Sequence, residues 1–156
     1  MRKIKILFVC HGNICRSTMC EFVFRDMVQK QGLGDRFHIE SAATSREEIG
    51  NPVHYGTRNK LKQLGISTEG KYAVQMTRKD YDKYDLLLGM DTWNIRNMLH
   101  ITGGDPDNKI HRLLDFTTEP RDIADPWYTG DFDTTYEDVY EGCIALLQYF
   151  RKEKWI

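Results

Sequence analysis

A short apolar segment close to the N-terminus, Ile4 to Val9, constrains the fold of this chain most strongly. The segment is too short for a stable helix and is rich in β-branched and aromatic residues, which is typical of a fully buried strand. From Thr18 to about Lys30 the apolar residues instead recur at helical spacing, and Thr18 and Glu21 fit a capping box at the helix start. The sequence therefore predicts a buried strand that passes through a short loop into a helix.

Segments of strand and helix character alternate along the rest of the chain. Further strands are predicted over residues 37–42, 85–90 and 110–114, and further helices over residues 54–64, 92–99 and about 134–152. Strands separated by helices require right-handed crossovers, which favour a parallel sheet covered on both faces. We therefore expect one α/β domain over residues 1–156, a three-layer sandwich around a four-stranded parallel sheet of order 2-1-3-4, with a ligand site beyond the carboxyl ends of the strands.

Two of the predicted helices have a clear apolar face. Asp91 is expected to cap the helix after the third strand, which would bury Ile95, Met98 and Leu99. The last helix is expected to bury one long stripe of side chains. That stripe consists of Tyr136, Val139, Tyr140, Cys143, Leu146, Leu147 and Phe150.

The loop between the first strand and the first helix has the composition of an anion-binding site. Backbone N–H groups at a helix start and the helix dipole both attract anions. Gly12 and Asn13 readily take the left-handed conformations that turn several N–H groups inward, and Arg16 offers a planar fork of donors. The same field favours the thiolate of Cys10. The loop thus predicts a nucleophile at the floor of a phosphate site, and the alternative is a Gly-Asn turn beside a buried cysteine.

Composition excludes several other classes of protein. The chain has 156 residues, of which 40% are hydrophobic and 29% are charged, as is typical of globular proteins. Its formal net charge of −1 gives no overall basic field that would indicate nucleic-acid or membrane binding. We expect no signal peptide and no membrane span. The four cysteines follow no metal-ligand spacing, which argues against zinc held by Cys10, Cys15 and Cys20. The sequence therefore predicts a reduced, cytoplasmic protein that needs no cofactor, and it leaves the oligomeric state open.

The loop resembles that of the low-molecular-weight protein tyrosine phosphatases. The family pattern is Val-Cys-x-Gly-Asn-x-Cys-Arg-Ser-Pro, and residues 9–17 match every specified position, whereas Thr18 replaces the proline. Proline there only pre-sets φ and gives up an N–H without a helical partner, so threonine should cost little. The segments 41–45 and 90–94 also match, and the resemblance spans essentially the whole chain.

A second motif, Asp125-Pro126-Trp127-Tyr128, follows the fourth predicted strand. On its own, Asp-Pro is a common turn signal. The family carries its general acid in Asp-Pro-Tyr-Tyr at this region, so the resemblance implies that Asp125 is the general acid and that Trp127 or Tyr128 forms an aromatic wall.

The resemblance implies a complete set of site residues for the hydrolysis of phosphotyrosine in proteins or peptides. Cys10 would attack phosphorus, Arg16 would hold phosphate oxygens, Asp125 would act as acid and then as base, and Ser17 would donate to the Cys10 thiolate. Loop residues His11, Gly12, Asn13, Ile14 and Cys15 would complete the phosphate site, with Trp127 and Tyr128 beside the substrate.

Two positions keep two interpretations, and two other places depart from the family pattern. Cys15 is either a small packing residue or, as the resemblance implies, the disulfide partner that protects Cys10 on oxidation. His11 lies at a variable position and either takes part in substrate choice or is merely exposed at the rim. Residues 46–49 replace an aromatic residue that many members have, and Lys71 lies near the position of a family histidine that braces the loop asparagine, so support for Asn13 is expected to differ.

Other functions are less consistent with the sequence. Arsenate reduction uses a similar loop but needs a downstream cysteine pair, and residues 80–99 contain no cysteine. A non-catalytic phosphate-binding module would have no need for Cys10, Arg16 and Asp125 together. Protein-arginine phosphatases usually carry a small threonine where this chain has Ile14, which favours a flat phosphotyrosine ring. Nine acidic residues between residues 115 and 142 also disfavour nucleic acid.

Overall fold

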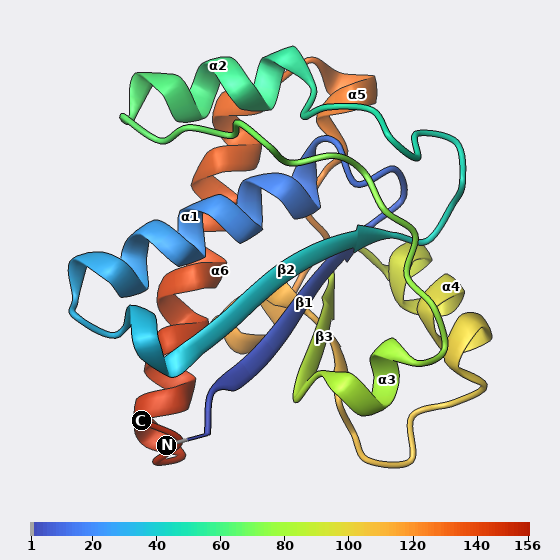
Figure 1. Cartoon of the computed structure of the whole chain (residues 1–156), viewed down its shortest axis with the longest axis vertical. Helices are drawn as coiled ribbons and strands as arrows, with labels where there is room; N and C mark the ends of the chain where they lie inside the picture. The colour runs from blue at the N-terminus through green and yellow to red at the C-terminus, as the bar shows by residue number, and fades with distance from the viewer. Residues whose placement is uncertain (1) are drawn as a thin grey trace.

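Four parallel strands form the centre of the computed structural model, which describes residues 2–156 (Figure 1). The strands are β1 (Ile4–Cys10), β2 (Phe37–Ala43), β3 (Leu86–Gly89) and β4 (Ile110–Arg112), in the order β2-β1-β3-β4. β1 pairs with β2 along its whole length, and its middle residues also pair with β3. The predicted parallel sheet and its strand order are therefore confirmed.

Helices cover both faces of the sheet, as predicted. The helices are α1 (Arg16–Lys30), α2 (Tyr55–Gln63), α3 (Asp80–Lys83), α4 (Thr92–Thr102), α5 (Pro126–Thr129) and α6 (Phe132–Lys152), with 3₁₀ turns at Gly34–Arg36 and Leu113–Phe116. Side chains of β1 alternate between two hydrophobic cores, so that Ile6 and Phe8 pack with α1 and α6, whereas Leu7 and Val9 pack with α3 and α4. Figure 1 shows these two helix layers on either side of the sheet.

Several local predictions were wrong. α1 begins at Arg16 and not at Thr18, whose hydroxyl donates to the Cys15 carbonyl, so Thr18 and Glu21 form no capping box. The fourth strand ends at Arg112 because the chain turns into a 3₁₀ helix. Leu99 and Tyr140, which were expected in the core, are 36% and 45% exposed.

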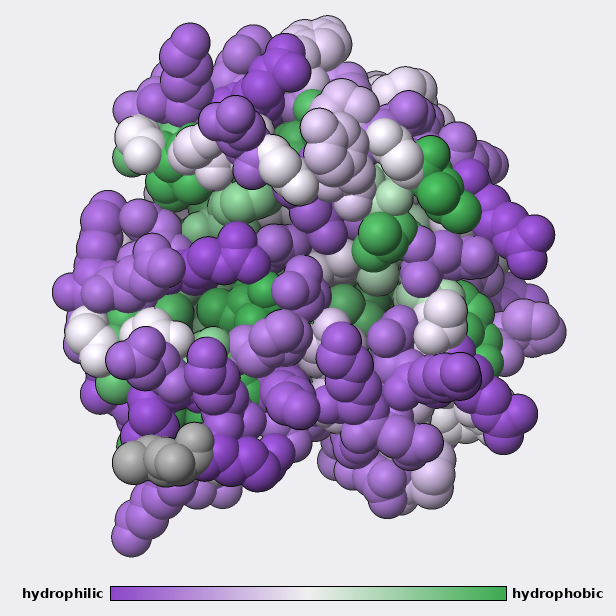
Figure 2. All heavy atoms as spheres, in the orientation of Figure 1, coloured by the Kyte–Doolittle hydropathy of each residue, from purple (hydrophilic) through white to green (hydrophobic). Residues whose placement is uncertain are grey.

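The surface has no single dominant apolar face in the view of Figure 2, where hydrophobic residues form separate patches among hydrophilic ones. Within residues 2–156, no helix combines the length and the apolar character that crossing a membrane requires.

The carboxyl ends of the strands bring distant segments of the chain together. Cys10 is the last residue of β1, and Asp91 lies two residues after the end of β3. After β4 the chain returns to this edge, where the Ile123 amide donates to the Met90 carbonyl at 2.9 Å. Asp125 follows two residues later, so one edge of the sheet collects the chemically active side chains that the sequence predicts.

Candidate active site

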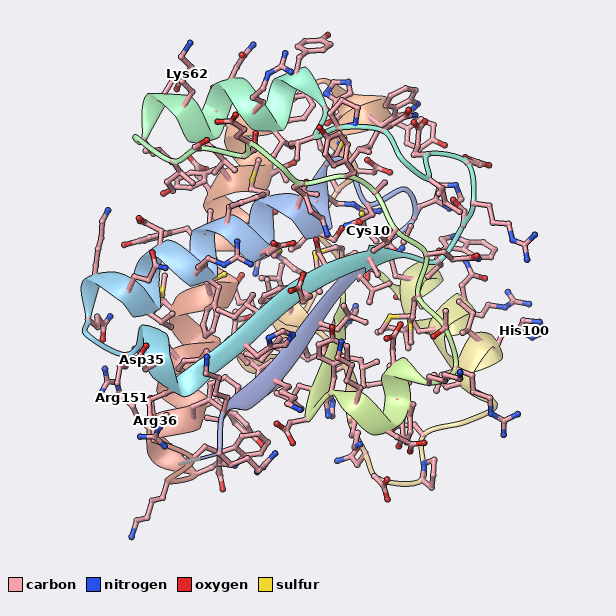
Figure 3. The ribbon with its side chains drawn as sticks, viewed as in Figure 1. Cys10, Asp35, Arg36, Lys62, His100 and Arg151 are labelled. Atoms are coloured by element: carbon pink, nitrogen blue, oxygen red, sulfur yellow. The ribbon has the colours of Figure 1, made fainter. Side chains whose placement is uncertain are left out.

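Cys10 lies at the point where β1 enters the loop that precedes α1 (Figure 3). Its side chain is buried, with the residue only 3% exposed. The Sγ atom lies 3.0 Å from the Ser17 hydroxyl and accepts a hydrogen bond of 3.3 Å from the Asn13 amide. The Asn13 amide and the Ser17 hydroxyl therefore both lie against the Cys10 sulfur.

Asn13 fixes the shape of this loop. Its backbone has a φ of 59°, in the left-handed region that asparagine tolerates better than most residues. Its side-chain amide donates to the hydroxyls of Ser17 at 2.8 Å and Ser41 at 2.9 Å, and its carbonyl accepts from the Val74 amide at 3.1 Å. Three partners on three segments therefore hold the strained residue in place.

A buried ion pair supports Asn13 from behind. The Ser41 hydroxyl donates to Glu21, and Lys71 donates to the Ser41 carbonyl at 2.8 Å and lies 3.4 Å from the Glu21 carboxylate. Lys71 is thus connected to Asn13 through Ser41.

Arg16 is almost completely buried between two carboxylates. Its Nη1 atom donates to Asp91 at 2.6 Å and to the Ile123 carbonyl at 2.8 Å, and Nη2 contacts Asp125 at 3.4 Å. Burial disfavours the charged guanidinium, but the negative charges of Cys10 and Asp91 outweigh it and raise the pKa of Arg16. Arg16 is therefore a fixed cation beside the Cys10 sulfur.

Asp125 lines the same cavity as Arg16. It caps α5, with one carboxylate oxygen accepting from the Trp127 amide at 3.0 Å and the other facing Arg16. The cavity has a volume of about 100 Å³. Its lining consists of Cys10, His11, Gly12, Ile14, Cys15, Arg16, Glu47, Glu48, Asp125, Trp127 and Tyr128.

The structure brings nearly all predicted site residues to this cavity. Asn13 and Ser17 are absent from its lining because they act from behind the loop, on the Cys10 sulfur. Trp127 and Tyr128 are 56% and 83% exposed, which leaves their rings available as an aromatic wall. A larger cavity of about 560 Å³ lies between α2 and residues 65–72, and none of these site residues lines it.

Part of the rim of this cavity is acidic. Glu47 and Glu48, of the segment without the aromatic residue that many family members have, line the cavity, and the His11 ring nitrogen is 2.9 Å from the Glu47 carboxylate. His11 therefore contacts the rim. Among the hydrogen bonds of residues 2–156, none joins its side chain to Cys10.

The other thiols have environments unlike that of Cys10. Burial, with the nearby charges of Cys10 and Asp125, raises the pKa of Cys15 to about 12. Burial also raises the pKa of Cys20 and of Cys143 well above the ordinary value. These three thiols stay protonated at neutral pH, and all four cysteines are free.

Several partners of the site were not predicted. Asp91 was expected only as a helix cap, yet it also binds Arg16, and Glu21, Ser41 and Glu48 were not assigned to the site. The available signal for Ser41 and Asp91 was that segments 41–45 and 90–94 match the family. These segments lie at the ends of the two strands beside β1. Among residues 2–156, no group of three or more His, Cys, Asp or Glu side chains is placed to hold a metal ion.

The fold and the loop together define a small α/β protein of the phosphatase type, with a Cys-x5-Arg-Ser loop at the carboxyl edge of a parallel sheet. Residues 5–155 match the sequence model of a family described as low molecular weight phosphotyrosine protein phosphatase, and the chain belongs to that family.

Individual relatives agree with this assignment. Low molecular weight protein-tyrosine-phosphatase YfkJ of Bacillus subtilis is 40% identical over 153 residues, covering 97% of this chain and 98% of the relative. The crystal structure of YfkJ has a TM-score of 0.95 and covers 99% of this chain and 98% of that chain. The low molecular weight phosphotyrosine protein phosphatase of Rattus norvegicus is 38% identical, covering 93% and 92%. The Drosophila arginine phosphatase DARP is also similar, at 28% identity and a TM-score of 0.87, covering 95% and 98%.

Proposed function

We propose that this chain hydrolyses phosphotyrosine in proteins or peptides through a cysteinyl-phosphate intermediate on Cys10. The observation that carries the proposal is the convergence of Cys10, Arg16 and Asp125 on one cavity at the carboxyl edge of the sheet. A sulfur with two donors, a buried cation and a facing carboxyl group are the parts that phosphoryl transfer to a thiolate requires.

In the first step, the phosphate group binds over the Cys10 sulfur. Nη1 of Arg16 is committed to Asp91 and Ile123, whereas Nε has no hydrogen-bond partner among the described residues and is free to bind a phosphate oxygen together with Nη2. Cys10 attacks phosphorus, the S–P bond forms, the bond from phosphorus to the aryl oxygen breaks, and Asp125 gives its proton to the departing phenolate.

In the second step, the intermediate is hydrolysed. Asp125, now a carboxylate, takes a proton from a water molecule that attacks phosphorus. The P–S bond breaks, and Cys10 leaves as a thiolate that Ser17 and the Asn13 amide stabilise. Release of inorganic phosphate restores the starting state, with a proton again on Asp125.

The walls of the cavity favour an aryl ester. Ile14, Trp127 and Tyr128 supply apolar and aromatic surface above the phosphate site, where a flat phenyl ring can pack. Ile14 also occupies more space than the small threonine expected for an arginine phosphatase. Because Cys10 must remain reduced, a reducing compartment such as the cytoplasm suits the proposed chemistry.

The test is hydrolysis of three peptides of the same sequence that carry phosphotyrosine, phosphoserine or phosphoarginine, with a chelator present. We expect phosphate release from phosphotyrosine only, and a Cys10→Ser variant that binds phosphate without turnover, because a serine hydroxyl is not ionised at neutral pH. A preference for the phosphoarginine peptide would mean that phosphoarginine, and not phosphotyrosine, is the substrate. Turnover by Cys10→Ser would exclude the covalent intermediate.

A further inference from the structure

A second cavity, of about 390 Å³, lies directly beside the catalytic one. The two cavities share the side chains of His11, Arg16, Asp125 and Tyr128 as a common boundary. On its far side the second cavity is lined by residues of α4, the helix that follows β3. A ligand whose reacting group fills the catalytic cavity can therefore continue over this boundary onto α4.

Two exposed side chains of α4 line this cavity, Trp93 and Asn97. They are four residues apart and so lie on the same side of the helix. Trp93 is 67% exposed, and the Asn97 side chain makes no hydrogen bond with the part of the chain that the structure describes. By contrast, Asp91 and Asn94, which also line the cavity, are both engaged in the capping box of α4.

One contact restricts the Trp93 ring. The capping box fixes the first turn of α4, and the Arg96 guanidinium lies 5.3 Å from the centre of the indole ring. A cation over one face restricts the ring at little cost and leaves the rest of its surface for a ligand. A positioned, exposed tryptophan beside a catalytic cavity is the kind of side chain that dominates binding energy at interfaces.

We propose that Trp93 and Asn97 form a subsite for a substrate residue next to the phosphotyrosine, and that this subsite selects an aromatic side chain. The inference rests on the proposed function, since the phosphotyrosine itself fills the catalytic cavity. The substrate side chain packs on the indole ring, and the Asn97 amide binds the peptide backbone. The subsite supplies aromatic surface, which the acidic rim at Glu47 and Glu48 lacks.

The test uses phosphotyrosine peptides of otherwise uniform alanine sequence, in which phenylalanine is placed in turn at each of the two positions on either side. At one or more positions we expect phenylalanine to raise kcat/KM about tenfold over alanine. A Trp93→Ala variant should reduce that ratio to about one, and Trp93→Phe should keep most of it. Leu99→Ala, on the same helix but outside both cavities, is the matched control and should keep the full ratio.

Two results would overturn the inference. One is that, in the enzyme without substitutions, phenylalanine raises kcat/KM less than about twofold over alanine at every position. Such a ratio corresponds to almost no binding energy. The other is a preference that persists in Trp93→Ala. Both leave the proposed function intact, because the all-alanine phosphotyrosine peptide is still hydrolysed, whereas failure to hydrolyse that peptide would contradict the proposed function itself.

Discussion

Arg16 interacts with its two carboxylate neighbours in different ways. The contact with Asp91 is short, at 2.6 Å, and comes from a helix cap that is part of the fold. The contact with Asp125 is longer, at 3.4 Å, and faces the cavity. Asp91 therefore fixes Arg16 from the side of the fold, whereas Nη2 faces the cavity together with Asp125.

The role of Asp125 is tested by the leaving group. Asp125→Asn keeps a side-chain oxygen that can cap α5 but removes the transferable proton. We expect kcat/KM for phenyl phosphate to fall by about 10²–10⁴-fold, whereas kcat/KM for p-nitrophenyl phosphate falls much less because its phenolate leaves without a proton.

A matched control for this variant is available on the next helix. Asp131 caps α6 through the Thr134 amide and lies outside the cavity, so Asp131→Asn should leave both rates unchanged. Equal losses for the two substrates in Asp125→Asn would mean that Asp125 is not the proton donor.

At the scale of the elements, the loop depends on contacts between α1, β2 and the segment before α3. Glu21 of α1 is buried and accepts from Ser41 of β2, while Lys71 binds both the Ser41 carbonyl and Glu21. Ser41 in turn holds Asn13, the left-handed residue of the loop. Packing of α1 against β2 therefore sets the position of the loop amides.

Removal of the Lys71 charge tests this network. Lys71→Met takes away a cation whose side chain is only 11% exposed and leaves Glu21 with one fewer partner. We expect the free energy of unfolding to fall by about 1–3 kcal/mol, measured by urea denaturation, because a buried carboxylate loses compensation. Lys62→Met is the control, since Lys62 lies on the outer side of α2 and points away from the molecule (Figure 3). Equal unfolding midpoints for the two variants would rule out a structural role for Lys71.

What the sequence predicts depends on how local the signal is. The strand, loop and helix of residues 4–30 have their own periodicity, and Cys10 and Arg16 are separated by only five residues. The predicted start of α1 at Thr18 was wrong because no threonine cap forms. The helix begins at Arg16, and its N-cap residue Cys15 makes no side-chain hydrogen bond. Tyr140 shares the helical spacing of the α6 core residues but lies at the edge of the buried face, which periodicity alone does not reveal.

At the scale of the whole molecule, the site is assembled from three distant segments. The loop after β1, the start of α4 after β3 and the α5 region after β4 meet through Arg16. The pairing of Arg16 with Asp91 depends on the strand order, which places β3 beside β1, so no local pattern could predict it. The sheet therefore works as the frame that brings a buried cation, two carboxylates and a thiol to one edge.

Because three segments share one cation, phosphate binding should stabilise all of them together. At a phosphate concentration of about 100 times Kd, linkage predicts about 2.7 kcal/mol of added stability, or a rise in Tm of roughly 5–10 °C for a chain of this size. Hydrogen exchange should slow not only in residues 11–16 but also around residues 91–94 and 125–129, because Asp91 and Asp125 of these segments contact Arg16. Arg16→Ala should lose the Tm rise, while Arg151→Ala, at the far end of α6, should keep it (Figure 3). Slower exchange confined to residues 11–16 would show that phosphate engages the loop alone and that α4 and α5 are not coupled to it.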